Sequence, residues 1–261
     1  MRCLRNMRKC MSGKGDKAPL GHVRGLNMRL YEYNFITGES KIHIKCDRKE
    51  AIWAAVAEIR DHREALVKYL RMHPEFQYTL RPISPLPDAP RIIRLMTEAS
   101  SRADVGPIAA VAGALADIGL EAMLKMEAKV ALVENGGEIA VYTEKPLIVS
   151  LFSNDPKFSN KIGFLIERDD CPLGLATSSS RTDRALSLGE ADSATIIADN
   201  ASTADAAATA VCNSVFGNNI EESIRKGLER AKVINGVRGA LIIRSGHSGL
   251  YGKLPRIIKI T

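Results

Sequence analysis

The sequence predicts an α+β fold in which antiparallel sheets carry helices on one side. Residues 31–36 and 40–46 read as two strands joined across Thr37-Gly38, and 129–134 and 138–142 as two more, joined by Asn135-Gly136-Gly137. Segments with helical periodicity lie between the pairs of strands. This order is typical of antiparallel sheets with helices on one face and not of a doubly wound parallel sheet.

Within the first pair, 40–46 alternates apolar Ile42 and Ile44 with polar His43 and Lys45, which indicates a half-buried strand. The next segment, 50–70, has apolar residues at helical spacing and is predicted to end before His73-Pro74. Four prolines make 81–91 an extended loop. A second helix is predicted over 106–125, where Ala and Gly allow close approach to the backbone.

The second half of the chain is richer in strands. Further strands are predicted at 147–152, 162–167, 173–177, 194–198 and 240–244. Two helices accompany them, an alanine-rich one beginning near Ser202 and one over 220–233. Strands, then helices, then strands occur twice along the chain, which suggests a duplication.

Composition narrows the class of protein. The 261 residues are 45% hydrophobic and 26% charged, as in an ordinary soluble protein with a large core. We expect no apolar run of the roughly 20 residues that a membrane span needs, and therefore no membrane partner. Five widely spaced cysteines without a Cys-x-x-Cys pair favour a reducing cytoplasm and disfavour a zinc site or a disulfide scaffold.

The positive charge is concentrated at the N-terminus. The first 28 residues hold seven Lys or Arg and one acid, and so supply +6 of the net charge of +7. We therefore divide the chain into a basic extension, 1–27, expected to be disordered, and a single domain, 28–261. The extension lacks the apolar segment of a secretory signal. Without aromatic stacking residues or a recognised module, it does not predict nucleic-acid binding.

The alanine-rich segment 198–211 carries the clearest candidate metal ligands. On a helix beginning near Ser202, Asp205 and Thr209 are four residues apart and share one face. A carboxylate and a hydroxyl are oxygen ligands of the kind that Mg²⁺ prefers, with water and substrate phosphate completing the shell. The alternative is structural, because Asp, Asn, Ser and Thr also cap helices and alanine allows close packing.

Several segments rich in small residues are candidate phosphate-binding loops. They are 105–117, the turn 135–138, the run 174–180 and the start of the alanine-rich helix. Such loops expose backbone N–H groups, and helix N-termini add a positive dipole end. Each also has a simpler interpretation, as a tight turn or a polar loop.

The order of four segments resembles the ApbE family: Ala-Gly-Ala-Leu-Ala-Asp (112–117), Glu-Asn-Gly-Gly-Glu-Ile-Ala (134–140), Gly-Leu-Ala-Thr-Ser-Ser (174–179) and Ser-Thr-Ala-Asp-Ala-Ala-Ala-Thr-Ala (202–210). ApbE proteins are magnesium-dependent flavin transferases that cleave FAD and attach FMN to a threonine of a target protein. The chain is more closely similar to an uncharacterised ApbE-like family of anaerobic archaea and bacteria, with Val-Gly-Pro-x-Ala-Ala-Val-Ala-Gly at 105–113. The resemblance implies a tandem T-fold-like duplication with a ligand site between the repeats.

The resemblance also implies site residues. Asp205 and Thr209 match the metal-binding Asp and Thr. The flavin-binding positions it implies are Asn135, Gly136, Gly137, Glu138, Thr177, Ser178 and Asp117. Two positions depart from the family, since Ala112 and Ala114 replace a lysine and a tyrosine, and 184–193 lacks the family's His-x-x-Asp-Pro segment.

Two functions follow from these residues. The first is binding of a flavin nucleotide, or another phosphate ligand, with Mg²⁺, leading to FMN transfer to a protein acceptor or to FAD cleavage. Its catalytic residues stay unassigned: Asp205, Asp192 and Glu138 are the candidate bases, and Arg181, Arg184 and Arg244 the candidate phosphate clamps. The alternative is an accessory role in anaerobic sulfur assimilation (homocysteine biosynthesis), with which the ApbE-like family is associated. Free sheet edges also suggest a homo-oligomer.

Overall fold

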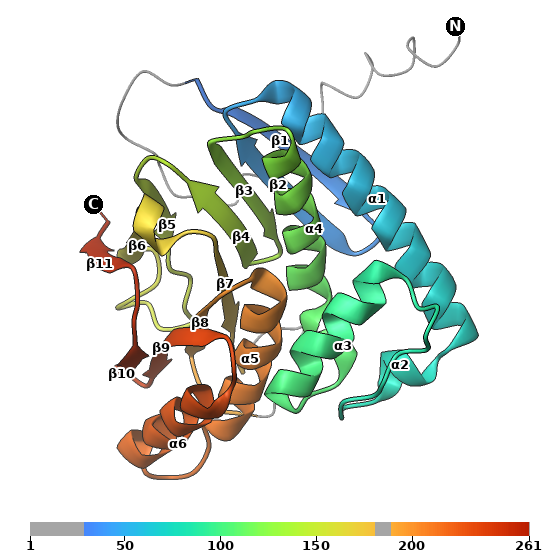
Figure 1. Ribbon diagram of the computed structural model, residues 1–261. Coiled ribbons are helices and arrows are strands. Elements are labelled where there is room, and N and C mark those ends of the chain that lie inside the picture. Colours follow the sequence, from blue (N-terminus) through green and yellow to red (C-terminus); the bar gives the residue numbers. More distant parts are fainter. Residues whose placement is uncertain (1–28, 181–188, 261) are drawn as a thin grey trace, which may run out of the picture.

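A computed structural model describes residues 29–180 and 189–260, and an eight-stranded antiparallel sheet is its centre (Figure 1). The order of strands in the sheet is β1-β2-β3-β4-β7-β8-β9-β10. Its strands are β1 (Tyr31–Thr37), β2 (Ser40–Cys46), β3 (Val130–Asn135), β4 (Glu138–Thr143), β7 (Leu173–Ser178), β8 (Ser193–Ala198), β9 (Val237–Arg244) and β10 (His247–Gly252). A second sheet, ordered β11-β6-β5, consists of β5 (Leu147–Ser150), β6 (Ile162–Ile166) and β11 (Arg256–Lys259).

Six helices accompany the sheets in the described residues. They are α1 (Lys49–Met72), α2 (Glu75–Tyr78), α3 (Arg91–Ala103), α4 (Val111–Lys125), α5 (Ala201–Ser214) and α6 (Ile220–Val233). Short 3₁₀ helices occupy Pro107–Ala110 and Arg168–Asp170. Helices α1, α4, α5 and α6 lie side by side, in that order, over one face of the large sheet (Figure 1).

The large sheet consists of two halves with the same order of elements. In the first half, β1 and β2 lead through helices to β3 and β4; in the second, β7 and β8 lead through α5 and α6 to β9 and β10. Within each half the strands pair in sequence order, and β4 pairs with β7 to join the halves. This arrangement confirms the α+β class and the repeated order of strands and helices. The junction brings α4 of the first half against α5 of the second.

The two faces of the sheet bury different side chains. Toward the helices the central strands present mostly alanine, such as Ala131, Ala140 and Ala176, which lets α4 and α5 lie close to the sheet. Toward the second sheet the same strands present larger side chains, such as Leu132, Val141 and Leu175. The sequence predicted helices on one side and this is confirmed, while the second sheet covers part of the other face.

Four of the helices and strands were not predicted: α2, α3, β10 and β11. Helix α2 has only four residues, and α3 begins directly after Pro90, at the end of the loop predicted over 81–91. Strands β10 and β11 were missed because they are short and, in β10, rich in Gly and polar residues. The helix predicted over 106–125 begins as a 3₁₀ turn and continues as α4.

The expectation about membrane-spanning runs needs a correction. One helical stretch of the described residues, Pro107–Lys125, is long and apolar enough to cross a membrane by length and composition, and 61% of its apolar window is buried inside the molecule. Asp117 and Glu121 interrupt the run in the sequence. Its packing against α1, α5 and the sheet is that of a core helix.

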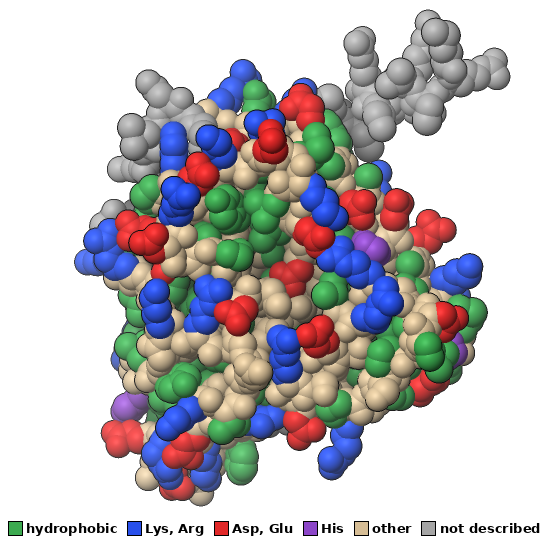
Figure 2. Space-filling view, in the orientation of Figure 1, with side chains coloured by type: hydrophobic (Ala, Val, Ile, Leu, Met, Phe, Trp, Pro, Cys, Tyr) green, Lys and Arg blue, Asp and Glu red, His purple; other side chains and the backbone are tan. Residues whose placement is uncertain are grey.

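Charge is evenly distributed over the helix-covered face. Lys and Arg side chains alternate with Asp and Glu across it (Figure 2), in keeping with the near-neutral composition after residue 28. The basic extension 1–27, Arg181 and Arg184 lie outside the described residues.

Candidate functional site

Helices α4 and α5 are in backbone contact at their N-terminal ends. A Cβ atom on Gly113 would lie 2.2 Å from the carbonyl oxygen of Ala201, so only glycine fits at this crossing. The helices run antiparallel there, because Gly113 bonds Asp205 while Asp117 bonds the amide of Ala201. Each helix thus gives one aspartate to the N-terminus of the other.

We call the end of this junction that contains Asp117 the closed end, because both carboxylate oxygens of Asp117 are hydrogen-bonded there. Its Oδ1 accepts a hydrogen bond from the amide of Ala201 at 2.7 Å, and its Oδ2 accepts one from the amide of Ser202 at 2.8 Å. Burial raises the pKa of Asp117 to about 6, although the amide hydrogen bonds and the charge of Arg91 act in the opposite direction. Asp117 therefore caps α5, together with the side chain of Asn200, which accepts from Thr203.

The other end of the junction, which we call the open end, contains Asp205. Its Oδ2 accepts a hydrogen bond from the amide of Gly113 at 2.9 Å, at the positive end of the α4 dipole. Burial raises the pKa of Asp205 well above its usual range, and the charge of Glu138 raises it further. The backbone amides of Gly113 and Ala112 both bond this carboxylate and act to lower its pKa, but by less than burial raises it.

Glu138 is the second carboxylate at this open end. It lies at the start of β4, where Ala140 faces the helices and Ile139 faces away, so strand alternation turns Glu138 toward the helices. Burial raises the pKa of Glu138 to about 7, and the charge of Glu134 adds to the shift. No Lys or Arg of the described chain forms an ion pair with Glu138 or Asp205. Two desolvated carboxylates without a counter-ion are a suitable setting for a cation.

The predicted glycine turn lies next to these acids. Gly136 and Gly137 have φ values of 75° and 125°, which favour glycine, and a Cβ on Gly137 would meet no atom within 4 Å. The side-chain amide of Asn135 donates to the carbonyl of Ala112 at 3.2 Å, which ties the turn to the first turn of α4. The turn therefore presents bare backbone beside Glu138.

Strand β7 ends with Thr177 and Ser178, and this end of the strand is near the glycine turn. Ile139 of β4 lies opposite Leu175 of β7, so the end of β7 is beside the glycine turn. The side chain of Thr177 points to the face of the second sheet, where its hydroxyl bonds that of Thr195 at 2.9 Å. Strand alternation turns Ser178 toward the helices. Of these two residues, only Ser178 presents its side chain on the face of Asp205.

Thr209 lies one helical turn after Asp205 on α5 and is half-buried. Among the described residues its hydroxyl has no hydrogen-bond partner, whereas Thr97 on α3 bonds the carbonyl of Ile93 in the usual way. Within the described ranges no group of three or more His, Cys, Asp or Glu has the geometry of a metal site. A cation here would therefore use two or three protein oxygens and complete its shell with water or substrate.

Two of the departures from the family, Ala112 and Ala114, lie at the start of α4. Ala114 is fully buried and Ala112 is half-buried, so neither position offers a cation or an aromatic ring. The remaining positive element is the N-terminal end of α4 itself.

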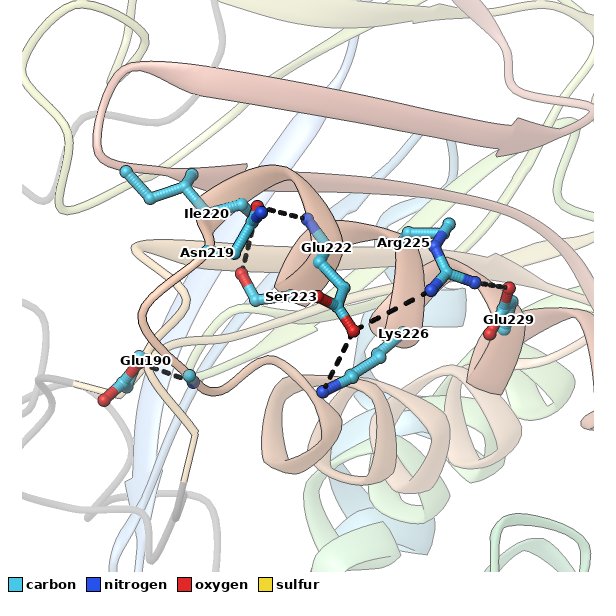
Figure 3. Close-up of polar contacts among 9 residues, drawn as sticks. Glu190, Asn219, Ile220, Glu222, Ser223, Arg225, Lys226 and Glu229 are labelled. Carbon is cyan, nitrogen blue, oxygen red and sulfur yellow. Dashed lines mark hydrogen bonds and ion pairs between the residues drawn. The ribbon is translucent and has the colours of Figure 1, made fainter.

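The other candidate groups are engaged in structural contacts. Arg244, with 9% of its surface exposed, pairs with Glu190, and Glu190 accepts from the amide of Gly217 before α6 (Figure 3). Asp192 accepts from the amide of Ser245 at 2.6 Å, and His247 is exposed beside the Ser245 carbonyl. None of these contacts lies at the α4–α5 junction.

Comparison with known proteins agrees with this arrangement. A family model described as "AbpE bacteria" matches residues 26–243, and the chain belongs to that family. Curated relatives named UPF0280 protein include one from Methanosarcina acetivorans, 35% identical over 87% of this chain and 88% of the relative. Another, from Methanopyrus kandleri, is 35% identical over 88% of this chain and 94% of the relative.

Solved structures show the same fold at low identity. The apo flavinyl transferase ApbE of Pseudomonas stutzeri superposes with a TM-score of 0.54 at 15% identity, covering 85% of this chain and 94% of that one. The ApbE protein of Thermotoga maritima gives a TM-score of 0.51 at 14% identity, covering 86% and 97%. The resemblance to ApbE noted from the sequence is confirmed, and so is the relation to an uncharacterised family.

Proposed function

We propose that this member of the ApbE-like family binds a flavin nucleotide together with Mg²⁺ at the open end of the α4–α5 junction. The single observation that carries the proposal is the pair Asp205 and Glu138, two desolvated carboxylates beside a bare glycine turn. The solved flavinyl transferase of similar fold supports a flavin as the ligand.

The donor set fits a hard cation. Asp205 would hold Mg²⁺ through a carboxylate oxygen, and Thr209 through its hydroxyl, which bonds nothing among the described residues. Glu138 adds a second carboxylate on the facing strand. When bound, the ion would neutralise charge on the diphosphate of the nucleotide.

The chain's own groups would orient the ligand. The N-terminal end of α4 favours the negative phosphates, and Gly136-Gly137 allows a flat ring to approach the backbone. The hydroxyl of Ser178 and the side-chain amide of Asn135 lie next to the turn. Of the predicted flavin-binding positions these contacts use Asn135, Gly136, Gly137 and Ser178 and leave out the side chains of Thr177 and Asp117, and they need no lysine at residue 112.

The reaction that we propose is cleavage of the FAD diphosphate. A hydroxyl oxygen attacks the phosphorus of the FMN half, AMP leaves, and the hydroxyl proton passes to a base. Glu138, which faces the helices from the start of β4, is the candidate base for that proton. With a threonine hydroxyl of a protein acceptor the product is FMN attached to protein, and with water it is free FMN.

A second candidate function is binding without catalysis, as an accessory protein in sulfur assimilation. The observation that favours it is the pair Ala112 and Ala114, which remove a cation and an aromatic ring from the ligand's surroundings. In this case Asp205 and Thr209 would still bind the metal and a nucleotide, but no AMP would be released.

The test is a calorimetric titration of the purified protein with FAD, FMN and ADP, with and without Mg²⁺. We expect Mg²⁺-dependent binding of FAD that Asp205→Asn weakens at least tenfold, since Asn keeps an acceptor for the Gly113 amide but loses the charge. Thr203→Val, on the same helix but bonded to Arg102, is the control. Release of AMP would separate catalysis from binding. Equal FAD affinity in the Asp205 variant would reject the site.

A further inference from the structure

Strand β10 is an edge of the large sheet without the features that normally protect an edge. No strand of the described chain pairs with its outer side. It has six residues, His-Ser-Gly-Leu-Tyr-Gly, without Lys, Arg, Asp, Glu or Pro. Natural edges are usually blunted by charge, proline or a bulge.

The geometry of the β9–β10 turn fixes which backbone groups point outward. Ser245 and Gly246 have φ values of 49° and 80°, as in a two-residue type I′ turn, so the flanking pair Arg244 and His247 exchanges hydrogen bonds. Hydrogen-bonded and non-bonded pairs then alternate along the hairpin. The N–H and C=O groups of Ser248, Leu250 and Gly252 therefore point away from β9.

The side chain at the centre of this row is apolar and exposed. Leu250 has 57% of its surface exposed although it lies opposite Leu241, which is 3% exposed in the core under the second sheet. Covering Leu250 would extend that core past the edge of the sheet. On the helix side, Gly249 packs against Ile224 and Leu228 of α6, so no side chain there blocks an approaching strand.

The opposite edge differs. In β1 the residues with outward backbone groups are Glu32, Asn34 and Ile36, and Glu32 forms an ion pair with Lys45 at 2.8 Å. A charged side chain on an edge strand disfavours pairing with another strand. The two edges therefore predict different behaviour in solution.

We propose that β10 pairs antiparallel with β10 of a second copy of this chain, across a two-fold axis at Leu250. In this register Leu250 lies opposite Leu250 of the partner copy and Ser248 opposite its Gly252, so that about four to six backbone hydrogen bonds form. The two eight-stranded sheets become one continuous sheet, and the two leucines cover each other. The register is self-complementary, which is what a two-fold dimer requires.

The test is sedimentation and light scattering of the full-length chain over a range of concentrations. The expected result is a dimer, with a dissociation constant that Leu250→Lys raises at least tenfold. Ile36→Lys, at the same kind of position on β1, is the matched control and leaves the dimer unchanged. A wild-type chain that stays monomeric, or a dimer that persists in Leu250→Lys, would overturn the proposal.

A cysteine variant tests the register. Paired Cα atoms in a hydrogen-bonded antiparallel pair are roughly 5.5 Å apart, within disulfide range. Leu250→Cys should therefore give a disulfide-linked dimer under mild oxidation, and Tyr251→Cys should not. The unmodified chain, with its own five cysteines, is the blank. Equal cross-linking in both variants would reject this register. None of these results depends on a flavin or metal ligand, so the proposal stands or fails apart from the proposed function.

Discussion

The two ends of the α4–α5 junction use the same residue type in different ways. At the closed end both oxygens of Asp117 bond the amides that begin α5. At the open end Asp205 bonds the amides of Gly113 and Ala112 and also faces Glu138, a second carboxylate. Both aspartates therefore hold the two helices together. The second acid beside Asp205 is the difference that makes only this aspartate a candidate ligand for a cation.

We expect the largest loss of stability from a substitution of Gly113, the glycine at which α4 and α5 are in backbone contact. Gly113→Ala gains about 1 kcal/mol of helix propensity, but its Cβ meets backbone atoms of Ala201 and Ser202 within 2.7 Å. Helix α5 must then move, and we expect a net loss of about 3 kcal/mol in the free energy of unfolding, measured with urea. Gly119→Ala on the same helix meets the flexible end of Ile59 and is the control. Equal stability of the two variants would contradict a rigid junction.

The closed end should matter more for stability than the open end. Asp117→Ala leaves the amides of Ala201 and Ser202 unpaired, and we expect a loss of about 2 to 3 kcal/mol. Asp205→Ala also loses the bonds to the amides of Gly113 and Ala112 but removes the repulsion by Glu138, so we expect a loss of about 1 kcal/mol. Thermal unfolding with and without Mg²⁺ measures both. Mg²⁺ should stabilise the Asp117 variant and not the Asp205 variant. If Mg²⁺ stabilised only the Asp205 variant, Asp117 would be the metal ligand and Asp205 the structural residue.

The pH dependence of stability reports on the buried acids of both ends, since burial raises the pKa of Asp117 to about 6 as well. Glu138 has a pKa near 7 and Asp205 one well above its usual range, whereas both lie near 4 in an unfolded chain. Between about pH 4 and 7 the folded state holds protons that the unfolded state has lost. Without metal, the contribution of these two acids to stability is therefore fully present below about pH 4 and is lost as the pH rises. Mg²⁺ binds the deprotonated acids, so its affinity should rise over the same range.

Chemical denaturation at several pH values, with and without Mg²⁺, measures the pH dependence of stability and of Mg²⁺ affinity. Glu138→Gln should flatten both trends, because it removes one titrating group and its effect on Asp205. Glu39→Gln, in the exposed turn between β1 and β2, is the control and should change neither. The same pH dependence in the Glu138→Gln variant as in the wild-type protein would exclude the carboxylate pair.

Short sequence patterns predicted much of this fold, but they did not predict contacts between residues that are far apart in the sequence. Asn135-Gly136-Gly137 predicted its hairpin because the turn needs positive φ values, and the ordered motifs predicted the family. Helix α3 was missed although Ile92, Ile93 and Met96 recur at helical spacing after Pro90, which would have been a sufficient signal. No spacing predicts that Asp117 reaches Ala201, because 84 residues separate them and only the folded sheet brings α4 to α5.

The smallest effect on stability, and the sharpest test of the open end, is expected from Thr209→Val. The two side chains have the same shape, and among the described residues the hydroxyl of Thr209 bonds nothing, so we expect stability to change by less than about 0.5 kcal/mol. The hydroxyl is a proposed Mg²⁺ ligand, and its loss should weaken Mg²⁺ binding about tenfold in a calorimetric titration. Ser214→Ala, which removes a hydroxyl that bonds Ala210 near the end of α5, should leave Mg²⁺ binding unchanged. Because Val preserves packing, a change in metal affinity would come from the lost oxygen alone. Unchanged affinity would reduce the open end to Asp205 and Glu138, and would make Thr209 a packing residue like the alanines around it.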